Sequence, residues 1–489
     1  MKTLIQKYLP AAAVLILVAG CDADISGSFG DDPDPGSADF STFVALGDSL
    51  TAGYADGALY RHGQENSFPA IMAQQFVLVG GGEFDQPLMD TGKTGSLTLS
   101  SVDLGRPDRL VLASNPVPDP DRPAVPLTIS PTGTTAIDVR LPNAGMYNNM
   151  GVPGAKSFHA IAPNYGELTI AAVAGKTANP YFARFASSNT VTMLADAQAQ
   201  VASFFVLWIG NNDILLYALD GADPTINSES VTPIGTFTTT YDLLLTGLNT
   251  VNNKGVLINI PDVSTIPYFT TVPYDAIPMD EATAAASNAA YAPYNGAIAG
   301  SGLPADEIAQ RTIVFAAGQN ALVIEDQYLT TLPGLPSIRQ ATAKDLVVLP
   351  ASRKIGTEDT PGDPATTWGV GKALEDADVL TEPEITQEIK PAQIAYNGVI
   401  KARAEADPDL LLFDMEALLT ELNTTGILYG SGGVSSTFAQ GGAFSLDGVH
   451  PTARGYAVIA NEMFKVINAG FGGYIPPVNP SDYSTVFYQ

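Results

Sequence analysis

Several apolar runs in this chain have the length of a strand, show no polar alternation, and stop at a polar turn. Residues 204–209 are six consecutive apolar side chains, and Gly210-Asn211-Asn212-Asp213 follows them. Such a run is typical of a strand covered on both faces of a parallel sheet, because helical crossovers cover both faces of that sheet. Similar runs occur at residues 43–46, 256–260 and 410–413.

The segments between these runs carry apolar residues at helical spacing. A helix is predicted after the first run from Phe68, Ile71, Met72, Phe76 and Val79, and further candidates lie at residues 282–298, 385–404 and 456–467. Strands that alternate with helices predict an α/β fold, with a mainly parallel sheet and helices on both of its faces. Residues 80–142 and 270–381 interrupt the alternation with turn-forming residues, so we predict two large insertions there.

The first 39 residues are predicted to lie outside the folded body. Two lysines precede an apolar stretch at residues 9–18 that is too short to span a bilayer, so residues 1–20 are typical of a signal peptide. Val18-Ala19-Gly20-Cys21 resembles a bacterial lipobox, which implies cleavage before Cys21 and its lipidation. An ordinary secretory signal is the alternative. Residues 22–39 are predicted to form a flexible acidic tether, and the folded body to span residues 40–489.

Charge and cysteine content exclude several classes of function. Asp and Glu total 51 against 23 Lys and Arg, a net charge of −28. This charge argues against nucleic acid as a partner and against a basic membrane-binding face, so the lipid anchor is the only membrane contact we predict. Cys21 is the only cysteine and the chain has three histidines, so we expect no disulfide, no metal and no cofactor. The oligomeric state stays open.

A candidate nucleophile follows the first apolar run, in Gly47-Asp48-Ser49-Leu50. A serine at a tight turn before a helix exposes its hydroxyl and lies near the positive end of that helix. This position suits a nucleophile whose attack creates an oxyanion. Asp-Ser is also a common pair at a helix N-cap, and that alternative is open from the motif alone.

Two further turns carry candidate catalytic groups. In Asp447-Gly448-Val449-His450, the acid can reach Nδ1 of the imidazole and leave Nε2 to accept a proton from a serine. A purely structural histidine at a helix start is the alternative. Asn212 lies at a strand end, where its amide could donate to an oxyanion, although asparagine is also an ordinary turn residue.

Together the three turns resemble the SGNH, or GDSL, hydrolase family. Residues 43–50 are similar to the first block of that family, Gly210-x-Asn212-Asp213 to its GxND block, and Asp447-x-x-His450 to its last block. The remaining block contributes a glycine to the oxyanion hole. Asn149-Met150-Gly151-Val152-Pro153-Gly154-Ala155 nominates Gly154 for this role, with Gly151 as a competitor.

The resemblance implies a three-layer α/β/α, flavodoxin-like fold and an esterase or lipase that works through an acyl-serine intermediate. It assigns the nucleophile to Ser49, the base to His450 and the orienting acid to Asp447. The oxyanion donors would be the N–H groups of Ser49 and Gly154 and the Asn212 side chain.

The substrate is left open within small-molecule, lipid and glycan esters. More than 100 residues separate Ser49 from Gly154, and more than 200 separate Asn212 from Asp447, so no substrate can be transferred from compact relatives. A carbohydrate O-acetyl esterase and a phospholipase or acyltransferase are alternatives on the same scaffold. A catalytically idle, glycan-binding surface lipoprotein is the alternative of another class. Lipidation would place the protein in a bacterial cell envelope, on a leaflet that the sequence does not identify.

Overall fold

The computed structural model describes residues 32–112, 127–128, 133–223, 225, 229–249, 253–430 and 432–487. The predicted signal peptide and Cys21 lie outside these described residues. The centre of the protein is a sheet of five parallel strands: β1 (Phe43–Gly47), β7 (Asn149–Gly151), β8 (Phe204–Trp208), β9 (Lys254–Ile258) and β16 (Leu410–Phe413). Their order across the sheet is β16-β9-β8-β1-β7. Numbered along the chain this is 2-1-3-4-5, a doubly wound order.

The four apolar runs predicted as strands are confirmed as β1, β8, β9 and β16. All five residues of β1 and of β8 are buried, as expected for central strands covered on both faces. The sequence analysis did not predict β7, which has only three residues and a single large apolar side chain, Met150. β7 pairs with β1 so that Gly151 lies opposite Gly47.

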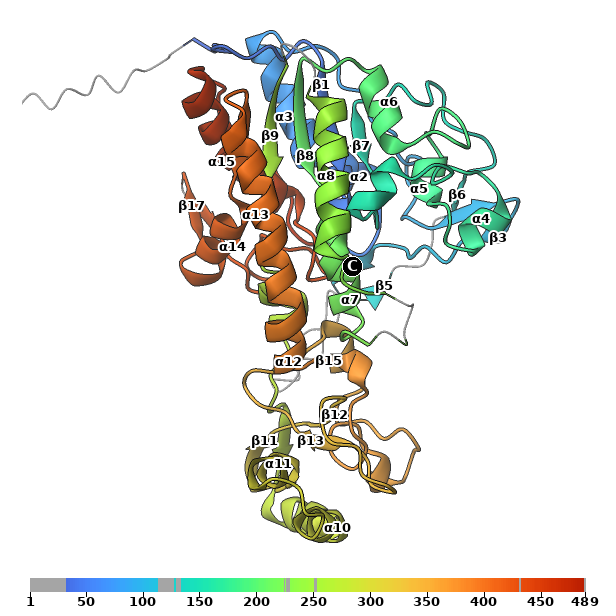
Figure 1. Ribbon diagram of the computed structural model, residues 1–489, viewed down its shortest axis with the longest axis vertical. Helices are drawn as coiled ribbons and strands as arrows, with labels where there is room; N and C mark the ends of the chain where they lie inside the picture. The colour runs from blue at the N-terminus through green and yellow to red at the C-terminus, as the bar shows by residue number, and fades with distance from the viewer. Residues whose placement is uncertain are drawn as a thin grey trace, which may run out of the picture.

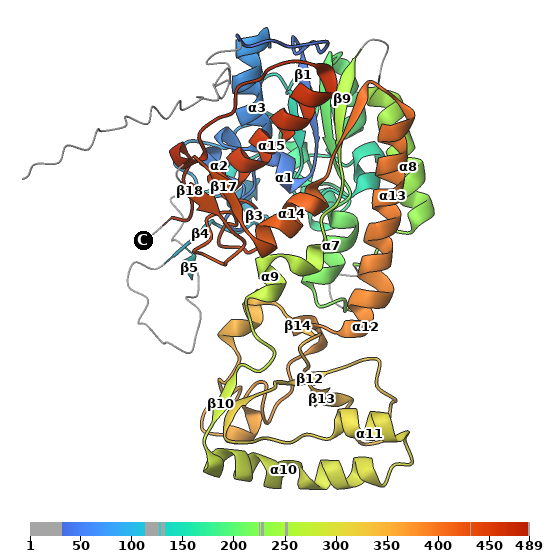
Figure 2. The same ribbon diagram turned by 90° about the vertical axis from the view of Figure 1, so that its left-hand side faces the viewer.

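Helices cover both faces of the sheet. On one face, α3 (Phe68–Phe76) packs against α15 (Ala453–Phe471), and the other face carries α6 (Met193–Ala199), α8 (Ile234–Leu248) and α13 (Lys390–Ala406) (Figure 2). Two helices begin directly after central strands, α1 (Ser49–Ala52) after β1 and α7 (Asn212–Leu219) after β8. The predicted α/β class with a parallel sheet is confirmed, and the arrangement is compatible with a three-layer α/β/α fold.

The second predicted insertion forms a lobe that extends from the end of the molecule where the strands terminate (Figure 1). It contains three two-stranded antiparallel pairs and two helices: β10 (Ile277–Met279) with β11 (Gly318–Asn320), β12 (Val323–Glu325) with β13 (Ile338–Gln340), β14 (Leu346–Val347) with β15 (Val379–Leu380), α10 (Glu281–Ala299) and α11 (Ala305–Arg311). The helix predicted at residues 282–298 is therefore present as α10. It lies in the lobe, away from the sheet (Figure 2).

In the described residues of the first predicted insertion, the regular elements are short strands. β2 (Leu97–Leu99) pairs with β3 (Val102–Asp103) and β6 (Thr135–Ala136), and β4 (Leu110–Val111) pairs with β5 (Leu127–Thr128). The segment returns to the loop after α1, where the Leu110 N–H donates to the Asp56 carbonyl oxygen over 2.7 Å. This contact places the insertion beside the candidate nucleophile.

The predicted boundary of the tether is wrong at its C-terminal side. Asp34 pairs with Tyr474 as an isolated β-bridge, and the Ser37 N–H donates to the Phe471 carbonyl oxygen over 2.8 Å. Ala38 is buried in the core. Folded structure therefore begins near Asp34 rather than at residue 40, because backbone hydrogen bonds hold a segment whose composition resembles a linker. Among the described residues, no helix combines the length and apolarity needed to cross a membrane.

Candidate active site

The turn between β1 and α1 positions Ser49. A Cβ atom on Gly47 would lie 2.4 Å from the Trp208 carbonyl oxygen, so only glycine lets β1 end this close to β8. Asp48 is the N-cap of α1 and accepts a hydrogen bond from the Leu50 N–H over 3.0 Å. The capping role therefore belongs to Asp48, and the nearly buried Ser49 hydroxyl is left for another partner.

That partner is His450, from a turn 401 residues further along the chain. Its Nε2 lies 2.8 Å from Ser49 Oγ, and its Nδ1 lies 2.9 Å from Asp447 Oδ2. The structure therefore brings together the three residues that the sequence analysis predicted as nucleophile, base and orienting acid. The chain of two hydrogen bonds has the order of a serine hydrolase triad.

Asp447 is held by backbone and side-chain donors. Its Oδ1 accepts from the N–H groups of Val449 and His450 and from the Ser445 hydroxyl, and its Oδ2 accepts from the Gly57 N–H over 2.8 Å. Burial by itself would raise the pKa of this carboxyl, but the charge of His450 and these hydrogen bonds lower it to about 2. Asp447 is therefore ionised at neutral pH.

The sequence analysis missed four residues that support this arrangement: Tyr54, Asp56, Gly57 and Ser445. The Tyr54 ring lies beside His450, with 4.7 Å between ring centres. Ser445 links two loops, because its hydroxyl donates to Asp447 and accepts from the Asp56 N–H over 2.8 Å. The one available signal was the Asp56-Gly57 pair, a turn motif shortly after the candidate nucleophile.

The end of β7 and the loop after it carry the two glycines predicted as alternative oxyanion donors, Gly151 in the strand and Gly154 in the loop. The Gly151 N–H donates to the Asn149 side chain over 2.9 Å, so it is occupied. Gly154 has φ +80°, and within the described residues neither its N–H nor that of Ser49 makes a hydrogen bond. The geometry therefore favours Gly154 over Gly151.

The two adjacent asparagines after β8 have different contacts. The Asn211 amide donates to Asp48 Oδ2 over 2.9 Å and so ties the turn after β8 to the turn after β1. The Asn212 amide donates to the Ala155 carbonyl oxygen over 3.0 Å, which uses one of its two N–H groups and places it beside Gly154. This arrangement favours Asn212 as the candidate oxyanion donor.

Two buried acids connect the loops instead of facing the triad. Burial raises the pKa of Asp48 to about 6, although hydrogen bonds from Asn211 and Leu50 oppose this shift. Burial also raises the pKa of Asp213, which accepts hydrogen bonds from the Ser157 N–H and hydroxyl over 2.7 and 2.6 Å. These contacts support a scaffolding role for both acids.

The base of the lobe rests on the turn that carries His450. The Tyr268 N–H donates to the Gly448 carbonyl oxygen over 2.9 Å. Gly448 has φ +72°, and a Cβ atom there would lie 2.9 Å from the Tyr268 nitrogen and 3.2 Å from a methyl group of Leu349. The second insertion therefore packs, through Leu349, directly against the turn that carries His450.

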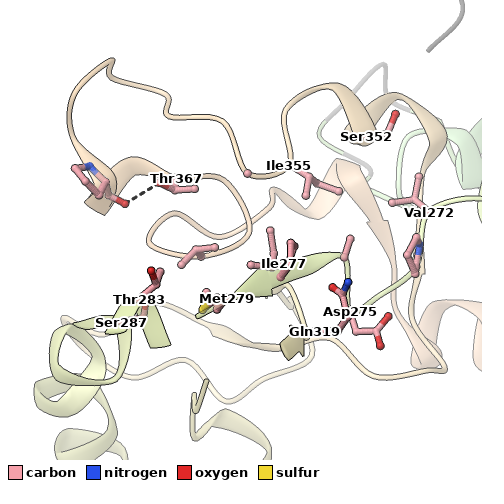
Figure 3. Close-up of a pocket in the computed structure, with 16 residues that line it drawn as sticks. Val272, Asp275, Ile277, Met279, Thr283, Ser287, Gln319, Ser352, Ile355 and Thr367 are labelled. Atoms are coloured by element: carbon pink, nitrogen blue, oxygen red, sulfur yellow. Dashed lines mark hydrogen bonds between the residues drawn. The ribbon is translucent and has the colours of Figure 1, made fainter. Parts of the chain in front are cut away.

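A cavity of about 650 Å³ lies inside the lobe rather than at the triad (Figure 3). Buried aliphatic residues such as Ile277 and Met279 line it together with exposed polar residues such as Thr283 and Gln319. A smaller apolar cavity of about 60 Å³ borders Leu50, next to the candidate nucleophile. We place the active site at the triad, because the groups with a defined chemical relation to one another are found there.

Comparison with known proteins does not classify the chain: no protein-family model matches it, and a search of curated proteins gave no match.

Within the described part of the chain, no three His, Cys, Asp or Glu side chains are grouped so that they could hold a metal ion. The exposed His62 pairs with the Ser484 hydroxyl over 3.0 Å and contacts neither Ser49 nor His450.

Proposed function

We propose that this chain is a serine hydrolase of the SGNH type that cleaves carboxylic esters. The observation that carries the proposal is the hydrogen-bonded chain from Ser49 through His450 to Asp447, with distances of 2.8 and 2.9 Å. The strand order supports a flavodoxin-like topology. Ser49 and Asn212 follow β1 and β8, the adjacent strands between which this order changes direction, and such a switch point is the expected ligand site of an α/β sheet.

In the acylation step, His450 Nε2 accepts the Ser49 proton while Ser49 Oγ bonds to the ester carbonyl carbon. The carbonyl electron pair moves to oxygen, and the N–H groups of Ser49 and Gly154 and the Asn212 amide stabilise the oxyanion. The ionised Asp447 stabilises the imidazolium. Collapse of the tetrahedral intermediate breaks the ester C–O bond, and His450 donates its proton to the departing alcohol.

In the deacylation step, His450 accepts a proton from water as the water oxygen attacks the acyl-serine. The second tetrahedral intermediate collapses, the carboxylic acid leaves, and Ser49 recovers its proton from His450. These residues supply every proton transfer that the reaction requires.

The proposal extends to location and to the range of substrates. The lipobox-like ending at Cys21 supports a lipid-anchored protein of a bacterial cell envelope. Glycan O-acetyl esters and phospholipids are substrates that the same chemistry can hydrolyse. The long insertions, of which the lobe packs against the catalytic turn at Gly448, support selectivity that differs from that of compact family members.

A fluorophosphonate probe and a panel of esters test the proposal. We expect the wild-type protein to be labelled at Ser49 and to hydrolyse at least one ester, and Ser49→Ala to lose both properties. Ser481→Ala is the matched control, since Ser481 is exposed and its replacement should leave both properties unchanged. A wild-type protein that is neither labelled nor active would be the idle, glycan-binding alternative.

A further inference from the structure

A polar cluster beside the triad contains two buried donors without acceptors. The ring of Tyr54 lies against His450, and the hydroxyl of Tyr54 lies close enough to Tyr181 that Tyr181 adds to the rise that burial causes in the pKa of Tyr54. The guanidinium carbon of Arg106 lies 5.6 Å from the centre of the Tyr181 ring. Within the described residues, Arg106 Nε is buried and has no hydrogen-bond partner, and the buried Tyr181 hydroxyl faces the Tyr54 hydroxyl as an acceptor but donates no hydrogen bond.

A buried donor without an acceptor is unfavourable in a folded protein. In Arg106 this applies to Nε, since the residue as a whole is partly exposed. Tyr181 is 3% exposed, so solvent does not satisfy its hydroxyl. Arg106 forms no ion pair with a described residue, although the chain carries 51 acidic side chains. A ligand that accepts from both groups would offset this cost.

Arg106 lies on the side of the triad where the candidate oxyanion hole is found. The Asn179 amide donates to the Pro153 carbonyl oxygen over 2.8 Å and to the Tyr165 hydroxyl over 3.0 Å. Burial raises the pKa of Tyr165, and the charge of Arg106 is near enough to oppose that rise. Gly154 follows Pro153 directly, and a Cβ atom on Gly154 would lie 3.9 Å from the Asn179 amide nitrogen. The Tyr181 N–H donates to Asn179 Oδ1 over 2.9 Å, so Tyr181, with Arg106 beside its ring, lies next to the loop that carries this candidate oxyanion donor.

We propose that Arg106 and Tyr181 bind an anionic oxygen group, a carboxylate or a phosphate, on the ester substrate. A guanidinium offers two parallel N–H donors to either group, and the tyrosine hydroxyl adds a third donor. A neutral ligand would accept hydrogen bonds but would leave the charge of Arg106 unpaired. This site rests on the proposed ester hydrolysis and adds a preference for a class of substrate. Ser49 and its partners carry out the reaction, and Arg106, from the 80–142 insertion, selects esters by their charge.

Three acetyl esters that differ only in one substituent test this site. Phenyl acetate is neutral, 4-acetoxybenzoate carries a carboxylate, and 4-acetoxyphenyl phosphate carries a phosphate. We expect the wild-type KM to be lower for at least one anionic ester than for phenyl acetate. Arg106→Gln should raise that KM about tenfold or more and leave phenyl acetate unchanged. Arg106→Lys should recover part of the effect, and Tyr181→Phe should give a smaller rise in KM.

Arg109→Gln is the matched control, because Arg109 belongs to the same insertion but lies over the rings of Tyr60 and Phe487. It should change no KM by more than about twofold. Equal wild-type KM values for neutral and anionic esters would overturn the proposal, and so would an equal loss on all three esters in Arg106→Gln. The anionic ester that is affected identifies the group that the site prefers.

A binding measurement separates failure of this site from failure of the proposed function. If the wild-type protein hydrolyses no ester, calorimetric titration with benzoate and with phenyl phosphate tests the site directly. Binding of either anion by the wild-type protein, with at least tenfold weaker binding by Arg106→Gln, supports the site. Equal binding by both proteins, or binding by neither, overturns it.

Discussion

Replacement of Asp447 by asparagine should trap His450, the proposed general base, in the wrong tautomer. Three donors converge on Oδ1 of Asp447, and they come from Ser445, Val449 and His450. If the amide oxygen of the new side chain keeps these three hydrogen bonds, the amide nitrogen faces His450 Nδ1. Nδ1 must then accept a hydrogen bond, so the ring proton moves to Nε2. In that tautomer, Nε2 cannot accept the proton of Ser49.

The expected cost differs between catalysis and stability. Loss of the correct tautomer should lower kcat about 10⁴-fold, which corresponds to roughly 5 kcal/mol of transition-state stabilisation. The folded-state pKa of Asp447, about 2, lies below the ordinary value of 3.8, so the ionised carboxylate stabilises the folded protein by about 2 kcal/mol. This stabilisation is present above pH 4 and is lost as the pH falls towards 2.

Two measurements check this reasoning. The first is kcat for a small acetyl ester at pH 7, for the wild-type protein and for Asp447→Asn. The second is the free energy of unfolding of both proteins between pH 2 and pH 7, where we expect a difference of about 2 kcal/mol at pH 7 that shrinks below pH 4. An asparagine variant that keeps a tenth or more of the wild-type kcat would refute the tautomer argument.

Three further predictions concern the triad, the buried acid Asp48 and the lipobox-like motif at Cys21. Ser49→Ala and His450→Ala should each lower kcat by several orders of magnitude, and kcat of the double variant should be little lower, because the two groups act as a unit; multiplicative effects would contradict this. Burial raises the pKa of Asp48 to about 6, so its ionisation destabilises the folded wild-type protein as the pH rises. The unfolding free energy of Asp48→Asn minus that of the wild-type protein should therefore increase by about 3 kcal/mol from pH 4 to pH 7. Parallel pH profiles of the two proteins would show the reasoning to be wrong. Cys21→Ser should release the protein from membranes or block its maturation, and unchanged membrane partitioning would count against lipidation.

Predictions from local patterns were the most accurate. The apolar run at 204–209 is a central strand, because a strand buried on both faces has no position for a polar side chain. The terminal helix carries its apolar residues on one face and became α15. Asp447 and His450 are three residues apart, so one turn is enough to bring the carboxylate to Nδ1.

Predictions failed where neighbouring elements decide the structure. β7 has almost no apolar pattern and becomes a strand because it pairs with β1. Residues 34–38 resemble a linker, but hydrogen bonds to Tyr474 and Phe471 make them part of the folded body. α10 has a helical pattern that is independent of its position, and only the structure places it in the lobe.

The sequence by itself determined the type of most elements, because strand burial and helix periodicity are local properties. It nominated the candidate residues of the triad, and the resemblance to the SGNH family assigned their roles. Only the tertiary structure decided that Ser49 and His450 meet across 401 residues, that the Gly151 N–H already has a partner, and that Asn212 rather than Asn211 lies beside Gly154. It also decided that Arg106 Nε and the Tyr181 O–H donate no hydrogen bond within the described residues. The physical reason is that a donor or acceptor is used or free according to what lies within about 3 Å of it, and packing of distant segments determines those neighbours.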